Sequence, residues 1–160
     1  MRVLVVSDTH RHNENYLKVL ELADPFDLVI HCGDVEGSEL LISEAAGCPA
    51  QIVCGNNDFF SELPYELEFK VGDLNVWVTH GHHFYVSMGT ELIRSEGLAR
   101  GKDVVIFGHT HKPCIEYVDG IVVMNPGSLS FPRQEGRKPS YIVMETDRFG
   151  IWHYDIRYLK

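Results

Sequence analysis

Side chains that bind divalent metals gather in five short segments of this sequence. They lie in Ser7–His10, His31–Asp34, Cys54–Asp58, Thr79–His83 and Gly108–His111. In the first segment Asp8 and His10 are two residues apart, and in the last His109 and His111 repeat this spacing. Alternate residues of an extended chain point to the same side, so each pair can aim at one ion. Carboxylate, amide and imidazole donors without thiolate favour manganese, iron, zinc or nickel over a structural Cys-type zinc site.

Each of these segments directly follows a short apolar run that we predict to be a strand. The runs are Val3–Val6, Leu28–Ile30, Gln51–Val53, Val76–Val78 and Val104–Phe107. Near-continuous apolarity over a few residues is typical of strands that are buried on both faces. The carboxyl ends of strands in an open α/β sheet line the ligand crevice. We therefore expect five strands to deliver the metal ligands to one edge of a sheet.

Helical spacing occurs between the predicted strands. The predicted helices are Asn13–Ala23, Ser38–Ala46 and Met88–Arg100, and Asn13 and Ser38 are candidate N-caps. In the third helix we expect Leu92, Ile93 and Leu98 to face inward, although Gly97 weakens its helical propensity. Alternation of strands and helices predicts an α/β core.

The pattern changes after Pro113. Four further strands are predicted at Ile115–Val118, Ile121–Met124, Tyr141–Thr146 and Ile151–Tyr158. Asp119-Gly120 is typical of a tight hairpin turn between the first two. We expect these strands to form a second, more antiparallel sheet that packs on the first, with the helices outside. The sequence contains no linker-like stretch, so residues 1–160 are predicted to form a single domain.

The composition of the sequence limits the kinds of partner and the cellular location that we expect. The formal net charge of −9 argues against a long nucleic acid or an anionic membrane surface, because both are bound through basic patches. The first apolar run is too short for a signal sequence or a membrane span. The cysteines form no CxxC pair, and we interpret Cys32, Cys54 and Cys114 as buried free thiols. A reducing, cytoplasmic location is therefore expected.

The five ordered motifs resemble those of the calcineurin-like metallophosphoesterase superfamily, in particular its small bacterial and archaeal phosphodiesterases. The resemblance runs from Asp8 to about Ser128 and implies a four-layer αββα sandwich of two mixed sheets. It assigns Asp8, His10 and His111 to one metal ion. It assigns Asn56, His80 and His109 to a second, with Asp34 bridging both. Manganese is the expected ion, with nickel, iron, zinc and magnesium as alternatives.

The expected reaction is hydrolysis of a phosphate ester, preferably a diester, by a hydroxide held between the two ions. Two divalent ions, a hydroxide and the carboxylates of Asp8 and Asp34 sum to about +1, which could attract a small anionic substrate to an acidic protein. Asp34, Asn57 and His82 are the candidate catalytic residues. Asn56, Asn57 and Ser128 are the candidate substrate-binding residues. For Ser128, a plain Pro-Gly turn formed by Asn125-Pro126-Gly127 is an equally good interpretation.

One position departs from the family pattern. Members commonly carry a histidine where this sequence has Asn57, and an asparagine cannot serve as a general acid at neutral pH. His12, His82 and His83 are the alternatives, because each lies beside a ligand segment. Asp58 is expected to orient the metal-bearing loop rather than to bind an ion.

Two questions stay open at this point. The same fold also occurs as a non-catalytic scaffold, which is the main alternative function; such scaffolds tend to lose metal ligands, and none is missing here. The aromatic residues of the last strand, Trp152, Tyr154 and Tyr158, are expected to cover a sheet face, and a homo-oligomer contact there is possible.

Overall fold

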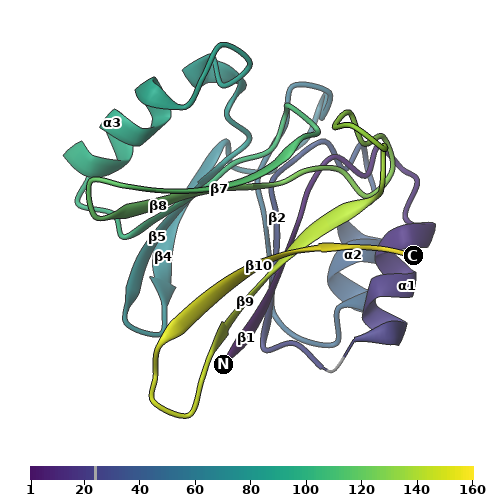
Figure 1. Ribbon diagram of the computed structural model, residues 1–160. Helices are drawn as coiled ribbons and strands as arrows, with labels where there is room; N and C mark the ends of the chain where they lie inside the picture. The colour runs from purple at the N-terminus through teal and green to yellow at the C-terminus, as the bar shows by residue number, and fades with distance from the viewer. Residues whose placement is uncertain (24) are drawn as a thin grey trace.

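Two five-stranded sheets form the centre of the computed structural model, which describes residues 1–23 and 25–160 (Figure 1). The first sheet has the order β10-β9-β1-β2-β3 and the second β4-β5-β6-β8-β7. The strands of the first sheet are β1 (Arg2–Val6), β2 (Leu28–His31), β3 (Ala50–Ile52), β9 (Ser140–Thr146) and β10 (Trp152–Tyr158). Those of the second sheet are β4 (Glu66–Val71), β5 (Leu74–Thr79), β6 (Val104–Ile106), β7 (Pro113–Val118) and β8 (Ile121–Pro126). Both sheets mix parallel and antiparallel pairs.

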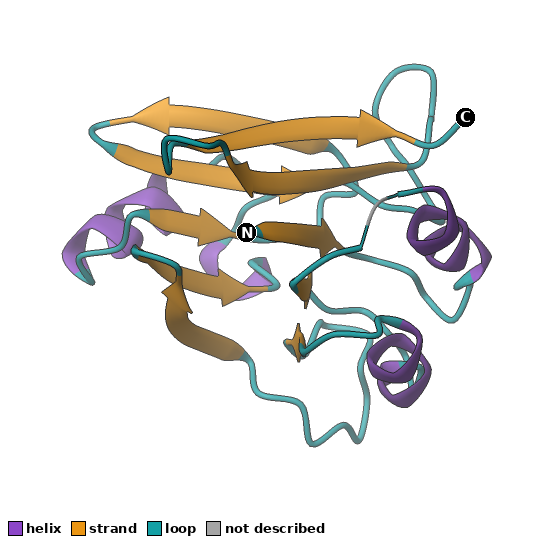
Figure 2. Ribbon diagram, turned by 90° about the horizontal axis from the view of Figure 1, so that it is seen from below, coloured by secondary structure: helices purple, strands orange, loops and turns teal. Residues whose placement is uncertain are grey.

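Helices cover the two outer faces. The helices are α1 (Glu14–Leu22), α2 (Glu39–Ala45) and α3 (Glu91–Ala99), with a short 3₁₀ turn η1 (His82–Phe84). Residues of α1 and α2 pack with the outer face of the first sheet, and α3 packs on the second sheet. Seen from below, the helices flank the strands on opposite sides (Figure 2). The αββα order implied by the family resemblance is therefore confirmed.

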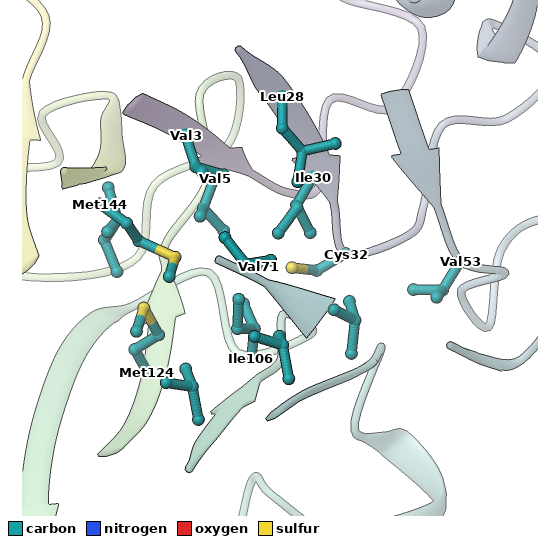
Figure 3. Close-up of a cluster of buried hydrophobic side chains, with 14 residues drawn as sticks. Val3, Val5, Leu28, Ile30, Cys32, Val53, Val71, Ile106, Met124 and Met144 are labelled. Carbon is teal, nitrogen blue, oxygen red and sulfur yellow. The ribbon is translucent and has the colours of Figure 1, made fainter. Parts of the chain in front are cut away.

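The core between the sheets follows from the pleat of the strands. Successive side chains of a strand point to opposite faces, so Val3 and Val5 of β1 enter the core between the sheets while Leu4 faces the helices. In Figure 3, Val5 of β1 and Cys32, the residue after β2, lie on the side of the core that faces Ile106 of the second sheet. Each fully buried aliphatic side chain of this kind contributes about 1.5–3 kcal/mol. The apolar runs of the sequence are explained by burial on both faces.

The prediction of one early sheet and one late sheet is wrong. The early runs divide: β1, β2 and β3 lie in the first sheet, whereas β5 and β6 lie in the second. The change of sheet occurs at β4, a strand that no apolar run announced because Glu66, Glu68 and Lys70 alternate with its apolar residues. β4 pairs antiparallel with β5, and β9 returns to the first sheet beside β1.

The helices also differ in detail from their prediction. Asn13 and Ser38 occupy the N-cap positions, but neither side chain caps its helix with a hydrogen bond. In α3 only Ile93 of the predicted inner face is buried, and Leu92 and Leu98 are exposed. Gly97 is buried instead, and a Cβ there would overlap the side chain of Val105 in β6, so the glycine lets α3 approach the sheet closely. No helix in the described ranges is long and apolar enough to cross a membrane.

Candidate metal centre

The loops that follow β1, β2, β3, β5 and β6 bring all seven predicted metal ligands together. Five of them have a positive φ although they are not glycine: Asp8 (55°), His10 (46°), Asp34 (59°), His109 (68°) and His111 (58°). This backbone conformation is costly for such residues and persists where the surrounding structure holds it in place, and such residues cluster at functional sites. Here hydrogen bonds between the loops hold it, from the Asp8 amide to the Gly33 carbonyl (3.1 Å) and from the His10 amide to the Asp34 carbonyl (2.9 Å).

Asp8 is fully buried, and its two carboxylate oxygens have different surroundings. Oδ2 accepts hydrogen bonds from the Ser7 hydroxyl (2.5 Å) and the His109 amide (3.1 Å). Oδ1 has no hydrogen-bond partner among the described residues. Three imidazole Nε2 atoms surround it instead, at 3.1 Å (His111), 3.8 Å (His10) and 3.9 Å (His80). A buried carboxylate oxygen without a donor, facing three ring nitrogens, fits a divalent ion between them.

The histidines are oriented for this task. In each of His10, His80 and His111, Nδ1 contacts an oxygen acceptor and therefore carries the proton, which leaves the Nε2 lone pair for an ion. The acceptors are, in the same order, Glu36 Oε1 (2.6 Å), the Cys32 carbonyl (2.6 Å) and the Phe131 carbonyl (2.7 Å).

Asn56, His80 and His109 form a second cluster. Asn56 Oδ1 lies 2.9 Å from His80 Nε2 and 2.9 Å from His109 Nδ1. Asp34 lies between the clusters, with its Oδ2 3.5 Å from His80 Nε2 and 3.7 Å from His10 Nε2. Asp8 also approaches His80, so this acid belongs geometrically to both groups. The arrangement can hold two ions side by side.

Asp34 is kept ionised. Burial pushes the pKa of this carboxyl up, but in the metal-free centre hydrogen bonds from a protonated His80 and from Asn57, together with the imidazolium charge of His80, outweigh burial and hold the pKa well below its ordinary value. Asn57 donates its backbone N–H to Oδ1 and its side-chain N–H to Oδ2, both at 2.8 Å. Asn57 therefore contacts the acid that joins the two clusters.

A model of the calcineurin-like phosphoesterase superfamily domain matches residues 1–148. The chain belongs to this superfamily. The family implies divalent metals, and the clusters described above are the candidate positions for them in this metallophosphoesterase.

Curated relatives agree with this assignment. The chain is 34% identical over 158 residues to the probable metallophosphoesterase YsnB of Bacillus subtilis, covering 97% of this chain and 91% of the relative. It is 35% identical over 145 residues to the phosphodiesterase MJ0936 of Methanocaldococcus jannaschii, covering 79% and 83%. The same fold occurs in wild-type Vps29 of Entamoeba histolytica complexed with Zn²⁺, with a TM-score of 0.78, 22% identity and 99% of each chain covered.

In this metallophosphoesterase Asp58 orients the loop after β3, as predicted. Its carboxylate accepts hydrogen bonds from three backbone amides, those of Asp34 (2.8 Å), Glu36 (2.6 Å) and Gly55 (2.7 Å). Gly55 is required here, because a Cβ at this position would overlap the Asp34 carboxylate. The loop after β2 and the loop after β3 are thus fixed to each other around Asp34.

The predicted contact between Ser128 and substrate is corrected by the structure. Ser128 is fully buried. Its hydroxyl donates to the Asp8 carbonyl (2.8 Å) and accepts from the amides of Ser130 (3.1 Å) and Phe131 (2.8 Å). The residue therefore joins the loop after β8 to the loop after β1, and its hydroxyl is not free to bind a phosphate.

The three candidate acids lie around the centre. The His82 ring is 5.4 Å from that of His80 and 4.0 Å from that of His83. Burial and the charges of these neighbours lower the pKa of His82 to about 4, so without metal it is neutral at pH 7 and is not a proton donor of the imidazolium type. His83 contacts Tyr65, and His12 packs edge-on against Phe131.

Some residues of the site were missed from the sequence. Glu36 and Phe131 hold His10 and His111 in place, and neither lies in a repeated motif. Cys32 and Cys54 are buried free thiols as predicted, whereas Cys114 is only half-buried. The glycines beside the predicted ligands did indicate that the loops pack closely around the site. A Cβ on Gly33, for example, would lie 2.8 Å from His80 Nδ1.

Proposed function

We propose that this metallophosphoesterase hydrolyses small phosphodiesters with two divalent ions, Mn²⁺ foremost, held by the seven residues named above. The observation that carries the proposal is the buried Asp8 Oδ1, which has three imidazole nitrogens around it and no hydrogen-bond donor among the described residues. The name of the phosphodiesterase relative supports a diester as the substrate.

The chain's own residues perform several tasks in such a reaction. When bound, the ions polarise the phosphate and supply a nucleophile from water at neutral pH. Asp8 and Asp34 set the charge of the centre, and the anchored Nδ1 atoms of His10, His80 and His111 keep the opposite ring nitrogens directed inward. The Asn57 amide donates to Asp34 and cannot protonate a leaving group. We therefore expect better turnover of esters with good leaving groups, such as aryl diesters.

A non-catalytic scaffold is the alternative, since Vps29 shares the fold. The complete set of ligands and the orientation of the three histidines disfavour it, because a scaffold has no need for three aligned lone pairs. We also propose a cytoplasmic location, since all four cysteines are unpaired.

Metal analysis and paired assays test the proposal. The purified protein should bind two Mn²⁺ ions and cleave a bis-aryl phosphodiester faster than the matching aryl monoester. Asp34→Asn should abolish activity, whereas Asp119→Asn, a matched change in the exposed β7–β8 turn, should leave it unchanged. Protein that is folded and supplied with Mn²⁺ but cleaves no ester would favour the scaffold.

A further inference from the structure

An open cleft of about 870 Å³ lies directly beside the Asp8, His10 and His111 cluster. Its volume falls in the range of small-molecule sites, about 300–1,000 Å³. The cleft is lined by His10, His12, Glu36, His111, Ser130, Phe131, Pro132, Arg133 and Arg137. Two candidate metal ligands, His10 and His111, form part of its wall. A group bound in the cleft could therefore belong to the same substrate molecule as a phosphate held at the metals.

The loop that carries Arg133 is fixed to the metal-bearing loops. The Arg133 amide donates to the His111 carbonyl (3.0 Å), and the Ser130 hydroxyl donates to the His12 carbonyl (2.7 Å). The Phe131 carbonyl in turn accepts from His111. The backbone of this loop is therefore held relative to the metal centre before any ligand binds, which lowers the entropic cost of binding.

Two positive charges in the cleft have no partner. The guanidinium groups of Arg133 and Arg137 form no ion pair or hydrogen bond with any residue in the described ranges. The acid in the cleft, Glu36, is already engaged, with Oε1 2.6 Å from His10 Nδ1 and Oε2 3.9 Å from Arg11 Nε. Both side chains are exposed, so in a protein with a net charge of −9 they form a local positive patch beside the active site that can attract an anion.

We propose that this cleft binds a second phosphate of the substrate, a terminal phosphomonoester on one arm of the diester. This inference rests on the proposed diesterase function. Guanidinium groups bind phosphate oxygens in pairs, and two of them match the two charges of a terminal phosphate. The half-exposed ring of Phe131 offers the intervening arm an apolar wall. The substrate class is thus a short phosphodiester that ends in a phosphate, such as a terminally phosphorylated dinucleotide.

Matched dinucleotides test the proposal. With Mn²⁺, the kcat/KM for either the 5′-phosphorylated or the 3′-phosphorylated dinucleotide should exceed that for the unphosphorylated dinucleoside monophosphate by about tenfold or more. In the double variant Arg133→Gln/Arg137→Gln this ratio should fall to about 1. Arg148→Gln, a matched loss of an arginine in the distant β9–β10 turn, should keep the wild-type ratio.

A binding measurement on metal-free protein gives a readout besides activity. Without metal no cleavage occurs, and calorimetry should show tighter binding of one phosphorylated dinucleotide than of the unphosphorylated one in the wild type. The double variant should lose this difference. Equal affinities in the wild type would overturn the proposal. Equal cleavage rates would also overturn it while leaving the diesterase function intact, whereas failure to cleave any diester would contradict the diesterase function itself.

Discussion

The two halves of the candidate metal centre are built differently. In the first half, Asp8 supplies a buried carboxylate, and His10 and His111 are each fixed through Nδ1. In the second half, Asn56 is exposed and neutral. His80 is fixed through the Cys32 carbonyl, but His109 directs its Nδ1 toward Asn56.

This difference predicts unequal affinity for metal. The first half provides a negative charge and two preoriented lone pairs, whereas the second half has to fix an amide and a half-buried imidazole when the ion binds. Outer hydrogen bonds to metal-binding histidines typically change affinity by about 10–100-fold. We therefore expect the ion of the first half to bind more tightly and that of the second half to leave first when a chelator is added.

The largest effect is expected from Asp8→Asn. Asparagine keeps the shape but removes the charge that both clusters share, so turnover should fall by about a thousandfold, or roughly 4 kcal/mol. Metal analysis should show that the tightly held ion is lost. His109→Ala should remove only the weaker ion. If both variants lost the same ion, the comparison between the halves would be contradicted.

Beneath the first half lies His31, which is buried and neutral. Its Nδ1 accepts from the Gly33 amide (3.2 Å) and its Nε2 contacts the Thr9 hydroxyl (3.1 Å). Burial lowers its pKa to about 4. The unfolded chain therefore takes up this proton first, near pH 6.5, and stability is present above that pH and lost as pH falls toward 4.

The expected loss for His31 is up to about 3 kcal/mol over this window, because each pKa unit corresponds to about 1.36 kcal/mol. Chemical unfolding of metal-free wild type and His31→Gln at several pH values measures it. The glutamine amide can accept from Gly33, so the variant should fold and show a flatter pH profile. His153→Gln removes an exposed ion pair with Asp147 and should change the slope much less, because exposed ion pairs contribute little to stability. Parallel profiles for wild type and His31→Gln would refute this role.

The sequence predicted which segments meet at the candidate metal centre better than it predicted the sheets. Each candidate ligand segment follows a buried apolar run, and this order of strand and ligand is the same in both sheets. The division between sheets was missed because β4 alternates charged and apolar residues, which is typical of a strand with one face outside the core. Pairing between distant strands, such as β1 with β9, leaves no local pattern to read.

The supporting contacts of the site were less predictable for a related reason. Glu36 and Phe131 hold His10 and His111, which lie 26 and 20 residues away in the sequence, respectively. The positive φ of Asp8 and His111 likewise follows from bonds between loops rather than from residue type. Ser128 lay in a recognisable turn, but only the fold shows that its hydroxyl is buried.

Glu36→Gln tests how much the contact with His10 strengthens metal binding in the first half. The amide can still meet His10 Nδ1 but lacks the charge that strengthens the ligand, so the tighter Mn²⁺ affinity should fall by about 10–100-fold. The weaker affinity should be unchanged. Calorimetric titration of the metal-free variant separates the two. As a matched control, Glu135→Gln removes an exposed acid from the loop after Arg133, and both affinities should stay at the wild-type values.

The smallest expected effect comes from Asn57→His, on the leaving-group chemistry. Asn57 donates to both oxygens of Asp34 through its backbone and side chain, and the backbone bond survives the substitution. An imidazole can in addition release a proton near neutral pH, which an amide cannot. Esters with poor leaving groups should gain most, so the ratio of alkyl to aryl ester turnover, and with it the balance of monoester to diester cleavage, should shift by severalfold. Paired assays at fixed Mn²⁺ measure both ratios. Asn57→Gln retains an amide and should leave them at the wild-type values, and ratios that stay constant in Asn57→His as well would show that position 57 does not govern the leaving group.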